Sequence, residues 1–289
     1  MSIKIISFNI ACSNGPEGHT LEECAPRVID VIKKKDPDII GFQEFTPRWH
    51  GLLDKFINEN GYELFIMYRA ESNKEGTPML WKKDKFECLD KGYFWLSDTP
   101  EVESKGWDEY GCHRICLWAK LKEKATGKVF VAANTHFGFG DQCQTDSARL
   151  ILSRINAHGT DAVFVTADYN FNSDMLGYKE MTKDFVDVTA STTGDNSPTY
   201  HGYDLANEMT DDEIRVTGKT FGGHIDFCSA NPKGITPITG KVLRENFDGK
   251  FPSDHNAVYF ELDGKSAPLK QPLARLFFLS KHRFFEARY

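Results

Sequence analysis

The sequence lacks the features that mark secreted and membrane-spanning proteins. Its seven cysteines are an odd number and include no Cys-x-x-Cys pair, so they do not form the pattern of a disulfide framework. No stretch approaches the roughly 18 consecutive apolar residues of a transmembrane helix, and the apolar alternation that begins at Ile3 leaves no space for a signal peptide. We therefore expect reduced thiols and a cytoplasmic protein without a membrane span.

The sequence also has no excess of basic residues. Lys and Arg number 35 against 42 Asp and Glu, and residues 265–289 hold six basic and one acidic residue, so residues 1–264 have a net charge of −12. An acidic body disfavours tight binding of nucleic acid through a broad basic face. A local basic strip or a bound cation is nevertheless enough to hold a phosphate.

Apolar residues are distributed as in a mixed α/β protein. Helix signals precede residue 35 and cover 47–60, 148–155 and 175–181, whereas polar, turn-rich sequence at 189–204 and 208–219 predicts surface loops. Alternation and short apolar runs predict strands at 3–10, 39–42, 64–68, 79–81, 86–94, 115–121, 129–134, 162–166, 185–188, 225–229 and 257–262. This order favours one domain over residues 1–264, a two-sheet sandwich with helices outside.

Polar and ionisable residues recur where the predicted strands begin or end. They are Asn9, Glu44, His136, Asp168, Asn170, Asp226, Asp254 and His255. Loops at one rim of a sandwich converge, so we expect these side chains to meet. Each has an ordinary explanation by itself, such as a glutamate that ends a strand or an aspartate in a turn. Their recurrence is what predicts a site.

The carboxylates and Asn170 suit the binding of a divalent cation and the orientation and deprotonation of a water molecule. Mg²⁺ prefers oxygen ligands and needs only one or two carboxylates, which Glu44 and Asp254 supply. The spacing of Asp168 and Asn170 puts both on the same side of an extended segment, where one accepts a proton from water and the other orients it. A turn that ends the strand is the alternative for this pair.

Histidine and arginine supply the remaining chemistry. His136 follows a strand and is able to act as a general acid or a phosphate ligand, or to be an ordinary structural histidine. Asp226 is a candidate to orient the imidazole of His255. Arg114, at the start of a strand, is able to contact a phosphate with two N–H groups, and an exposed arginine at a sheet edge is the alternative.

Six short motifs follow one another along the chain. They are Ser7-Phe8-Asn9-Ile10, Gln43-Glu44, Asn134-Thr135-His136, Ala167-Asp168-Tyr169-Asn170, His224-Ile225-Asp226 and Ser253-Asp254-His255. In this order they resemble the endonuclease/exonuclease/phosphatase family, the superfamily of exonuclease III and pancreatic deoxyribonuclease, over about residues 1–264. Residues 94–100, 106–108 and 114–116 are similar to its bacterial branch of metal-dependent hydrolases. The resemblance implies a four-layered α/β sandwich with two mixed β-sheets packed face to face and helices outside.

The resemblance also implies a role for each candidate on the metal side. Glu44 would be the main Mg²⁺ ligand, with Asn9 and Asp254 nearby, and Mn²⁺ would be able to replace Mg²⁺. Asn9 would also contact the phosphate. Asp168 with Asn170 would orient or deprotonate the attacking water.

The histidines and Arg114 would act on the phosphate and the leaving group. His255, paired with Asp226, would contact the phosphate or serve as the base, so the resemblance leaves the identity of the base open. His136 would lie on the leaving-group side, oriented by Glu75. Arg114 would neutralise a non-bridging oxygen.

The activity implied is that of a Mg²⁺-dependent phosphoesterase that hydrolyses a phosphodiester or phosphomonoester by metal-assisted attack of water, with a nuclease among the candidates. A phosphatase or phosphodiesterase of small-molecule or lipid head-group phosphates is the alternative, and a catalytically silent binding module on the same fold is less favoured. Phe94, Trp95, Trp107 and Tyr110 would stack bases, pack against a lipid or sugar, or lie in the core. The expected partner is a phosphate ester, with nucleic acid as one candidate.

Residues 265–289 lie beyond the resemblance and are basic and aromatic. Leu269, Leu273, Leu276 and Phe277 have helical spacing, with Lys and Arg between them. Three interpretations are open for this tail: a helix docked on the acidic body, a weak contact with a membrane, nucleic acid or partner, or a segment without fixed structure.

Overall fold

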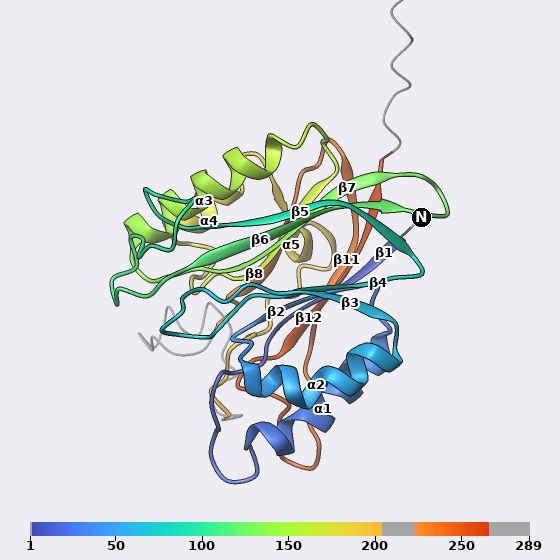
Figure 1. The fold of residues 1–289 in the computed structure, drawn as a ribbon, viewed down its shortest axis with the longest axis vertical. Helices are drawn as coiled ribbons and strands as arrows, with labels where there is room; N and C mark the ends of the chain where they lie inside the picture. The colour runs from blue at the N-terminus through green and yellow to red at the C-terminus, as the bar shows by residue number, and fades with distance from the viewer. Residues whose placement is uncertain (1, 204–222, 266–289) are drawn as a thin grey trace, which may run out of the picture.

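Two β-sheets pack face to face in the centre of the molecule, and helices lie on their outer sides (Figure 1). The computed structural model describes residues 2–203 and 223–265. Each sheet has six strands and contains both parallel and antiparallel neighbours. The four-layered α/β sandwich expected from the sequence is therefore confirmed.

The first sheet is built around the parallel pair β1 (Ser2–Asn9) and β2 (Ile39–Gln43). Parallel neighbours need a crossover, and α1 (Leu21–Lys35) provides it on the outer face, which α2 (Pro47–Glu59) also covers (Figure 1). The strand order is β11, β12, β1, β2, β4 and β3, where the strands not yet described are β11 (Ile235–Leu243), β12 (Ala257–Gly264), β4 (Met79–Lys82) and β3 (Tyr62–Phe65).

The second sheet repeats this arrangement around the parallel pair β7 (Val129–His136) and β8 (Val163–Asp168). Here the crossover is α3 (Asp141–Asn156), and α4 (Leu176–Met181) packs beside it. The strand order is β5, β6, β7, β8, β10 and β9, where the other strands are β5 (Phe86–Trp95), β6 (Ile115–Glu123), β10 (Asp226–Ala230) and β9 (Val186–Asp187).

Local sequence signals set the two ends of α1. The Thr20 hydroxyl accepts a hydrogen bond from Glu23 N, and the Glu23 side chain accepts one from Thr20 N, so the two residues form a capping box. The face of the helix that includes Val28 and Ile32 is buried against the first sheet. Asp36 takes a left-handed conformation, with φ 46°, and ends the helix.

Apolar side chains fill most of the space between the sheets. Ile5 and Ile39 of the first sheet belong to the same buried cluster as Leu117, Ala132 and Phe164 of the second. Two further clusters lie between the sheets and their helices. Burial of one such large side chain contributes about 1.5–3 kcal/mol, so these contacts hold the layers together.

The space between the sheets becomes polar around Asn134, near the carboxyl ends of the parallel strands. Asn134 Oδ1 accepts hydrogen bonds from Gln43 Nε2 (2.8 Å) and Thr166 Oγ1 (3.0 Å), and its Nδ2 donates to Phe42 O (2.7 Å). Gly41 faces this amide, and a Cβ there would lie 2.6 Å from Asn134 Oδ1. Gln43 and Asn134 belong to the sequence motifs, yet the structure uses both to join the sheets beneath the rim.

Strand β11 is not revealed by the sequence pattern. It contains Pro237 and Gly240, which are rare in strands. β11 lies at the edge of its sheet, where proline is tolerated, and the ladder is irregular between Pro237 and Thr239. The edge position therefore permits a strand that composition alone disfavours.

The predictions for residues 185–204 are partly wrong. Only two residues of the strand expected at 185–188 form β9, because the Asp187 carboxylate accepts hydrogen bonds from two backbone N–H groups and begins the helix α5 (Val188–Thr192). The surface loop expected at 189–204 includes His201, which is fully buried. Polar composition misleads here because the buried polar groups find hydrogen-bond partners.

The predicted loop at 208–219 and the tail after Lys265 lie outside the described residues. Within residues 2–203 and 223–265, no helix is long and apolar enough to cross a membrane.

Replacement of Asn134 by alanine tests the polar junction between the sheets. We expect the free energy of unfolding to fall by about 1–3 kcal/mol, because buried donors of Gln43 and Thr166 each lose one of their acceptors. Urea unfolding measures the change. Asn73→Ala, at an exposed position, is the control and is expected to change it by less than about 0.5 kcal/mol. Equal, small effects of the two substitutions would contradict the role of Asn134.

Candidate active site

The carboxyl ends of the parallel strands bring the predicted polar residues together. β1 ends with Asn9, β7 with His136 and β8 with Asp168, and Glu44 follows β2 directly. Asn9 Nδ2 lies 2.8 Å from Asp168 Oδ2 and 3.1 Å from Glu44 Oε1, and it donates to both. One amide therefore connects side chains that come from both sheets.

Glu44 holds its carboxylate at the rim through an uncommon backbone conformation. Its φ of 59° lies in the left-handed region, which a non-glycine residue adopts at a cost. Oε2 accepts a hydrogen bond from Cys12 N at 2.8 Å. Burial alone would raise the pKa of Glu44, but the positive charge of His255 and the hydrogen bonds from Asn9 and Cys12 lower it below its usual value, so the group is ionised.

Asp254 provides a second, half-buried carboxyl group near Glu44. Burial raises the pKa of Asp254 and the charge of Glu44 adds to this effect, against the opposite influence of His255. A divalent cation relieves such crowding of acidic groups, and carboxylate oxygens are ligands that Mg²⁺ and Mn²⁺ prefer. Asn9 Oδ1 accepts a hydrogen bond from Ala11 N at 3.1 Å and has one lone pair left. The residues fit a divalent cation, and the ligand set stays a prediction.

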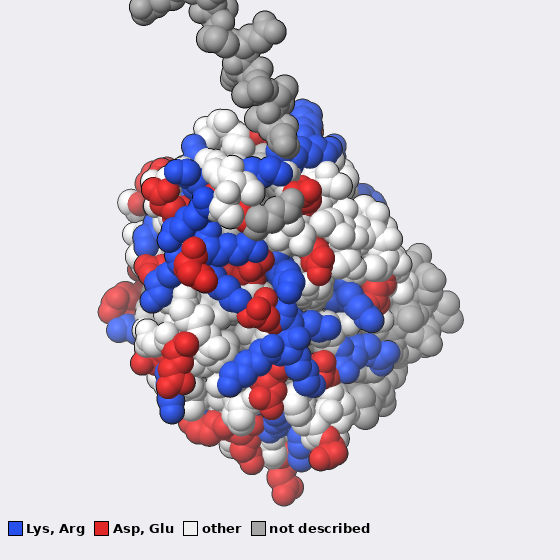
Figure 2. Space-filling model, turned by 90° about the vertical axis from the view of Figure 1, so that its right-hand side faces the viewer, with Lys and Arg blue, Asp and Glu red and all other residues white. Residues whose placement is uncertain are grey.

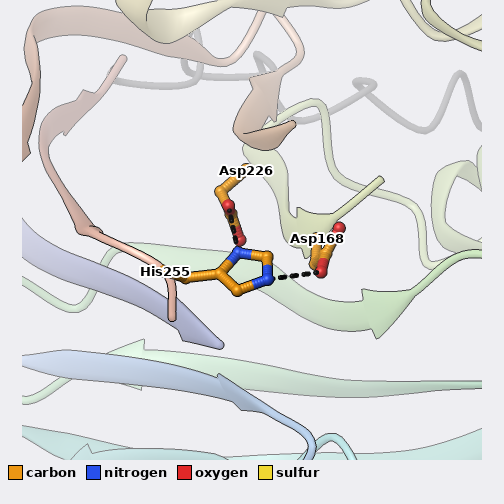
Figure 3. Close-up of side chains that lie close together, drawn as sticks. All are labelled: Asp168, Asp226 and His255. Carbon is orange, nitrogen blue, oxygen red and sulfur yellow. Dashed lines mark hydrogen bonds and ion pairs between the residues drawn. The ribbon is translucent and has the colours of Figure 1, made fainter. Parts of the chain in front are cut away.

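A second cluster consists of Asp168, Asp226 and His255, whose possible ligand atoms lie within 4.8 Å of one another (Figure 3). His255 Nδ1 is 2.9 Å from Asp226 Oδ2, and Nε2 is 3.7 Å from Asp168 Oδ2. Burial alone would lower the pKa of His255, but the charge and hydrogen bond of Asp226 raise it to about 10. Each ring nitrogen faces a carboxylate, an arrangement that suits a protonated imidazole better than a bound metal ion.

The two carboxylate oxygens of Asp168 have different neighbours. Burial, and then the charge of Asp226, raise the pKa of Asp168 to about 7. Oδ1 accepts a hydrogen bond from Asn170 N at 2.8 Å, whereas Oδ2 faces Asn9 and both histidines. A carboxylate with these neighbours is suited to accept a proton near neutral pH.

The extended geometry expected for Asp168 and Asn170 is wrong, although both side chains reach the site. Asn170 has a φ of 52°, so the chain turns instead of continuing β8. The hydrogen bond from Asn170 N to Asp168 is that of an Asx turn. The interpretation as a turn and the functional interpretation are therefore compatible. The turn places the Asn170 amide within hydrogen-bond distance of His136 Nε2 and of Phe137 O, at 2.8 Å from each.

His136 lies on the other side of Asp168, beside a small cavity that Glu75 and Arg114 also line. The Asn170 amide donates to Nε2, so the ring proton is on Nδ1. Burial lowers the pKa of His136 well below its usual value, with Arg114 contributing, and the imidazole is neutral. Nδ1 is 3.9 Å from Glu75 Oε1, too far for a hydrogen bond, so Glu75 faces His136 without fixing its orientation.

Arg114 is buried and not exposed at a sheet edge. Its Nε donates to Asp108 Oδ2 at 2.9 Å, whereas Nη1 is buried and has no hydrogen-bond partner among the described residues. A buried unpaired donor that lines the cavity beside His136 is available to an anionic group. Two residues here were not predicted from the sequence. Asp108 could have been found through the 106–108 motif, whereas Arg69, which donates to Glu75 Oε2 at 2.7 Å, has no sequence signal.

The aromatic candidates separate into buried and exposed positions. Phe94 and Trp95 are buried, and Trp95 Nε1 donates to Arg69 O at 2.8 Å. Trp107 is half-buried. Tyr110 is 75% exposed, so of these rings it is the one most open to a ligand.

The sequence profile of the Endonuclease/Exonuclease/phosphatase family matches residues 6–255, and the chain belongs to this family. Its members are phosphoesterases. Among solved structures, the endonuclease/exonuclease/phosphatase of Bacteroides vulgatus is 28% identical, with a TM-score of 0.79 over 92% of this chain and 100% of that one.

Two further relatives carry different descriptions. The mannosyl-6-phosphatase of Bacteroides thetaiotaomicron is 25% identical, with a TM-score of 0.77 over 90% of this chain and 99% of that one. The uncharacterized protein L388 of Acanthamoeba polyphaga mimivirus is 25% identical over 219 residues, which are 66% of this chain and 80% of that protein.

Replacement of Glu44 by glutamine keeps the size of the side chain and removes its charge. We expect the affinity for Mg²⁺ or Mn²⁺, measured by isothermal titration calorimetry, to fall at least about tenfold. Glu59→Gln, at an exposed position on α2, is the matched control and should bind like the wild type. Unchanged affinity of Glu44→Gln would place the metal elsewhere, with the cluster around His255 as the next candidate.

Replacement of Asp226 by asparagine tests the origin of the charge on His255. Loss of the carboxylate should lower the pKa of His255 by about 1–3 units, because a nearby opposite charge no longer favours the protonated ring. NMR titration of the imidazole protons measures this shift, with Asp30→Asn on the exposed side of α1 as the control. A titration of His255 that is the same in both variants would contradict the assignment.

Proposed function

We propose that the protein is a metal-dependent phosphoesterase that hydrolyses small phosphate esters by direct attack of water, with Mg²⁺ as its cofactor and Mn²⁺ as a substitute. One observation carries this proposal. Asp168 Oδ2 is buried at the meeting point of strands from both sheets, with Asn9 Nδ2 at 2.8 Å, His136 Nε2 at 3.5 Å and His255 Nε2 at 3.7 Å.

The geometry favours Asp168 over His255 as the base. His255 Nδ1 is hydrogen-bonded to Asp226, whereas Nε2 is 3.7 Å from Asp168 Oδ2, beyond hydrogen-bond distance. This imidazole is therefore placed to act as a cation whose Nε2–H contacts the phosphate. Asp168 Oδ2 accepts the proton of the attacking water, and Asn170 orients that water. As the bond from the water oxygen to phosphorus forms, the bond from phosphorus to the leaving oxygen breaks, and the leaving oxygen takes up a proton from the surrounding water.

The remaining site residues would bind the cation and stabilise negative charge on the phosphate and the leaving group. Glu44 and Asp254, with Asn9, would hold the cation, which when bound stabilises negative charge on the phosphate oxygens. Arg114 Nη1 donates to a non-bridging oxygen. His136 lies on the leaving-group side.

The distribution of positive charge supports a small substrate over a long nucleic acid. Figure 2 views the end of the molecule where β1 begins, and Lys and Arg gather there among Asp and Glu. Ion pairs at this end neutralise several lysines: Lys82 with Asp36, Lys85 with Asp38 and Lys128 with Asp263. The site lies at the opposite ends of the parallel strands. A mannosyl-6-phosphatase among the similar structures supports a phosphomonoester, whereas a nuclease would need a basic strip that tracks a phosphate backbone.

The other expectations fit this proposal. Every predicted site residue is present at the rim or beside the cavity, which disfavours a catalytically silent binding module. All seven cysteines are free thiols, which favours a cytoplasmic location.

Hydrolysis assays with Mg²⁺ test the proposal on p-nitrophenyl phosphate, bis-p-nitrophenyl phosphate, sugar phosphates, inositol phosphates, sphingomyelin, DNA and RNA. We expect turnover of phosphomonoesters, and a loss of at least about 10²-fold in Glu44→Ala and in His255→Ala. Glu59→Ala and His158→Ala, which replace the same residue types away from the rim, should keep full activity. Turnover retained in either site variant would refute the role assignment, and turnover of nucleic acids alone would replace the phosphatase by a nuclease.

A further inference from the structure

Two exposed aromatic rings contact each other beside the candidate site. Among the described residues, the aromatic side chains with exposed surfaces are Tyr93 (38%), Tyr110 (75%) and Phe139 (38%). Tyr110 and Phe139 form an edge-to-face pair with ring centroids 5.2 Å apart and planes at 84°. We call this pair the aromatic platform.

The chain path places the aromatic platform on the leaving-group side of the site. Phe139 comes three residues after His136, so the two Cα atoms are at most about 11 Å apart. Tyr110 belongs to the loop that precedes Arg114, and Glu109 N in this loop donates to Phe139 O at 3.2 Å. The platform is therefore within reach of a group attached to a phosphate that lies between Arg114 and His136.

Asp108 connects the aromatic platform to Arg114 through hydrogen bonds. Its Oδ1 accepts a hydrogen bond from Tyr110 N at 2.8 Å, and its Oδ2 accepts one from Arg114 Nε at 2.9 Å. The Asp108 side chain is fully buried, and a Cβ at Gly138 would lie 2.3 Å from its Oδ2. The buried Asp108 carboxylate thus fixes the position of the Tyr110 backbone relative to the Arg114 guanidinium.

The groups around the platform indicate what it would bind. Glu109 and Asp141 are exposed acidic residues adjacent to it along the chain, and Lys105 Nζ lies near Gly111. Aromatic faces pack against the C–H groups of a sugar ring, and carboxylates accept hydrogen bonds from its hydroxyl groups. The same carboxylates would repel the further phosphates of a nucleic acid chain. The surroundings thus match a neutral polyhydroxylated ring.

We propose that the aromatic platform binds the sugar ring of a hexose phosphate whose phosphate occupies the candidate site, so that Tyr110 and Phe139 determine specificity for the leaving group. This inference rests on the proposed phosphoesterase activity and names the substrate class. Asp108 acts as a positioning residue, because it holds the platform and Arg114 in one arrangement.

Steady-state kinetics on a ring-bearing and an acyclic monoester test the inference, with glucose 6-phosphate and mannose 6-phosphate compared with glycerol 3-phosphate. In the double variant Tyr110→Ala/Phe139→Ala, we expect kcat/KM for the hexose phosphates to fall at least about tenfold, mainly through KM, since the packing of the sugar ring against the platform is lost. The value for glycerol phosphate should change less than about twofold, because this substrate has no ring. Tyr110→Phe keeps the ring and should retain most of the activity on hexose phosphates.

Tyr93→Ala is the matched control, because Tyr93 on β5 is as exposed as Phe139 and lies outside the platform. Thermal unfolding of each variant shows whether the fold is retained. Equal losses on both kinds of substrate, no loss on either, or wild-type hydrolysis of other esters without hydrolysis of hexose phosphates would overturn the platform and leave the phosphoesterase intact. Absence of hydrolysis of every ester, including p-nitrophenyl phosphate, would overturn both.

Discussion

The hydrogen bonds from the Asn9 amide to Glu44 and Asp168 are the contact on which the candidate site depends. They join the two sheets at the carboxyl ends of their parallel strands. Side chains on a strand alternate between faces, so a slip of one residue in β1 or β8 would turn these groups away from each other. The hydrogen bonds of Asn134 join β2 of the first sheet to β7 and β8 of the second. The site at the rim therefore depends on this polar junction between the sheets.

The site has an acidic side and a side lined by Arg114 and His136, and Asp168 lies between them. On the acidic side Glu44 and Asp254 crowd together, and His255 offsets part of their charge. On the other side Arg114 is oriented by Asp108 and keeps one donor unpaired. Glu44 and Asn170 both have positive φ angles, which are energetically unfavourable for residues other than glycine. These conformations place the two side chains at positions that a regular strand would not reach.

Under the proposed function, the same buried contacts would connect the phosphate site with the group that determines specificity. Asp108 supports both Arg114 and the aromatic platform, so the distance between the phosphate site and the platform is set by one side chain. The free rings and the nearby carboxylates differ in character from the lysine-rich end of the sheets (Figure 2). This division would separate the surface proposed for a small neutral leaving group from surfaces that carry solvated ion pairs.

Much of the fold and the membership of the site follow from the sequence, because alternation, apolar runs and helix caps are local signals. Polar residues at strand ends could be recognised for the same reason. β11 escaped recognition because an edge strand tolerates Pro237 and Gly240, and α5 because one carboxylate at Asp187 starts a helix where a strand was expected. Asp108 lies in a segment that matched the family, but its pairing with Arg114 is known only from the folded chain. Arg69 escaped because its pairing with Glu75 is also known only from the folded chain.

By itself, the sequence determined the two-sheet architecture and the set of polar residues delivered to one rim. Only the tertiary structure decided that Arg114 is buried with a free donor, that Glu75 stands 3.9 Å from His136, and that Tyr110 meets Phe139 at the surface. The physical reason is that strand periodicity depends on neighbours along the chain. The distances between side chains of different strands and loops depend on how the sheets pack across their shared core.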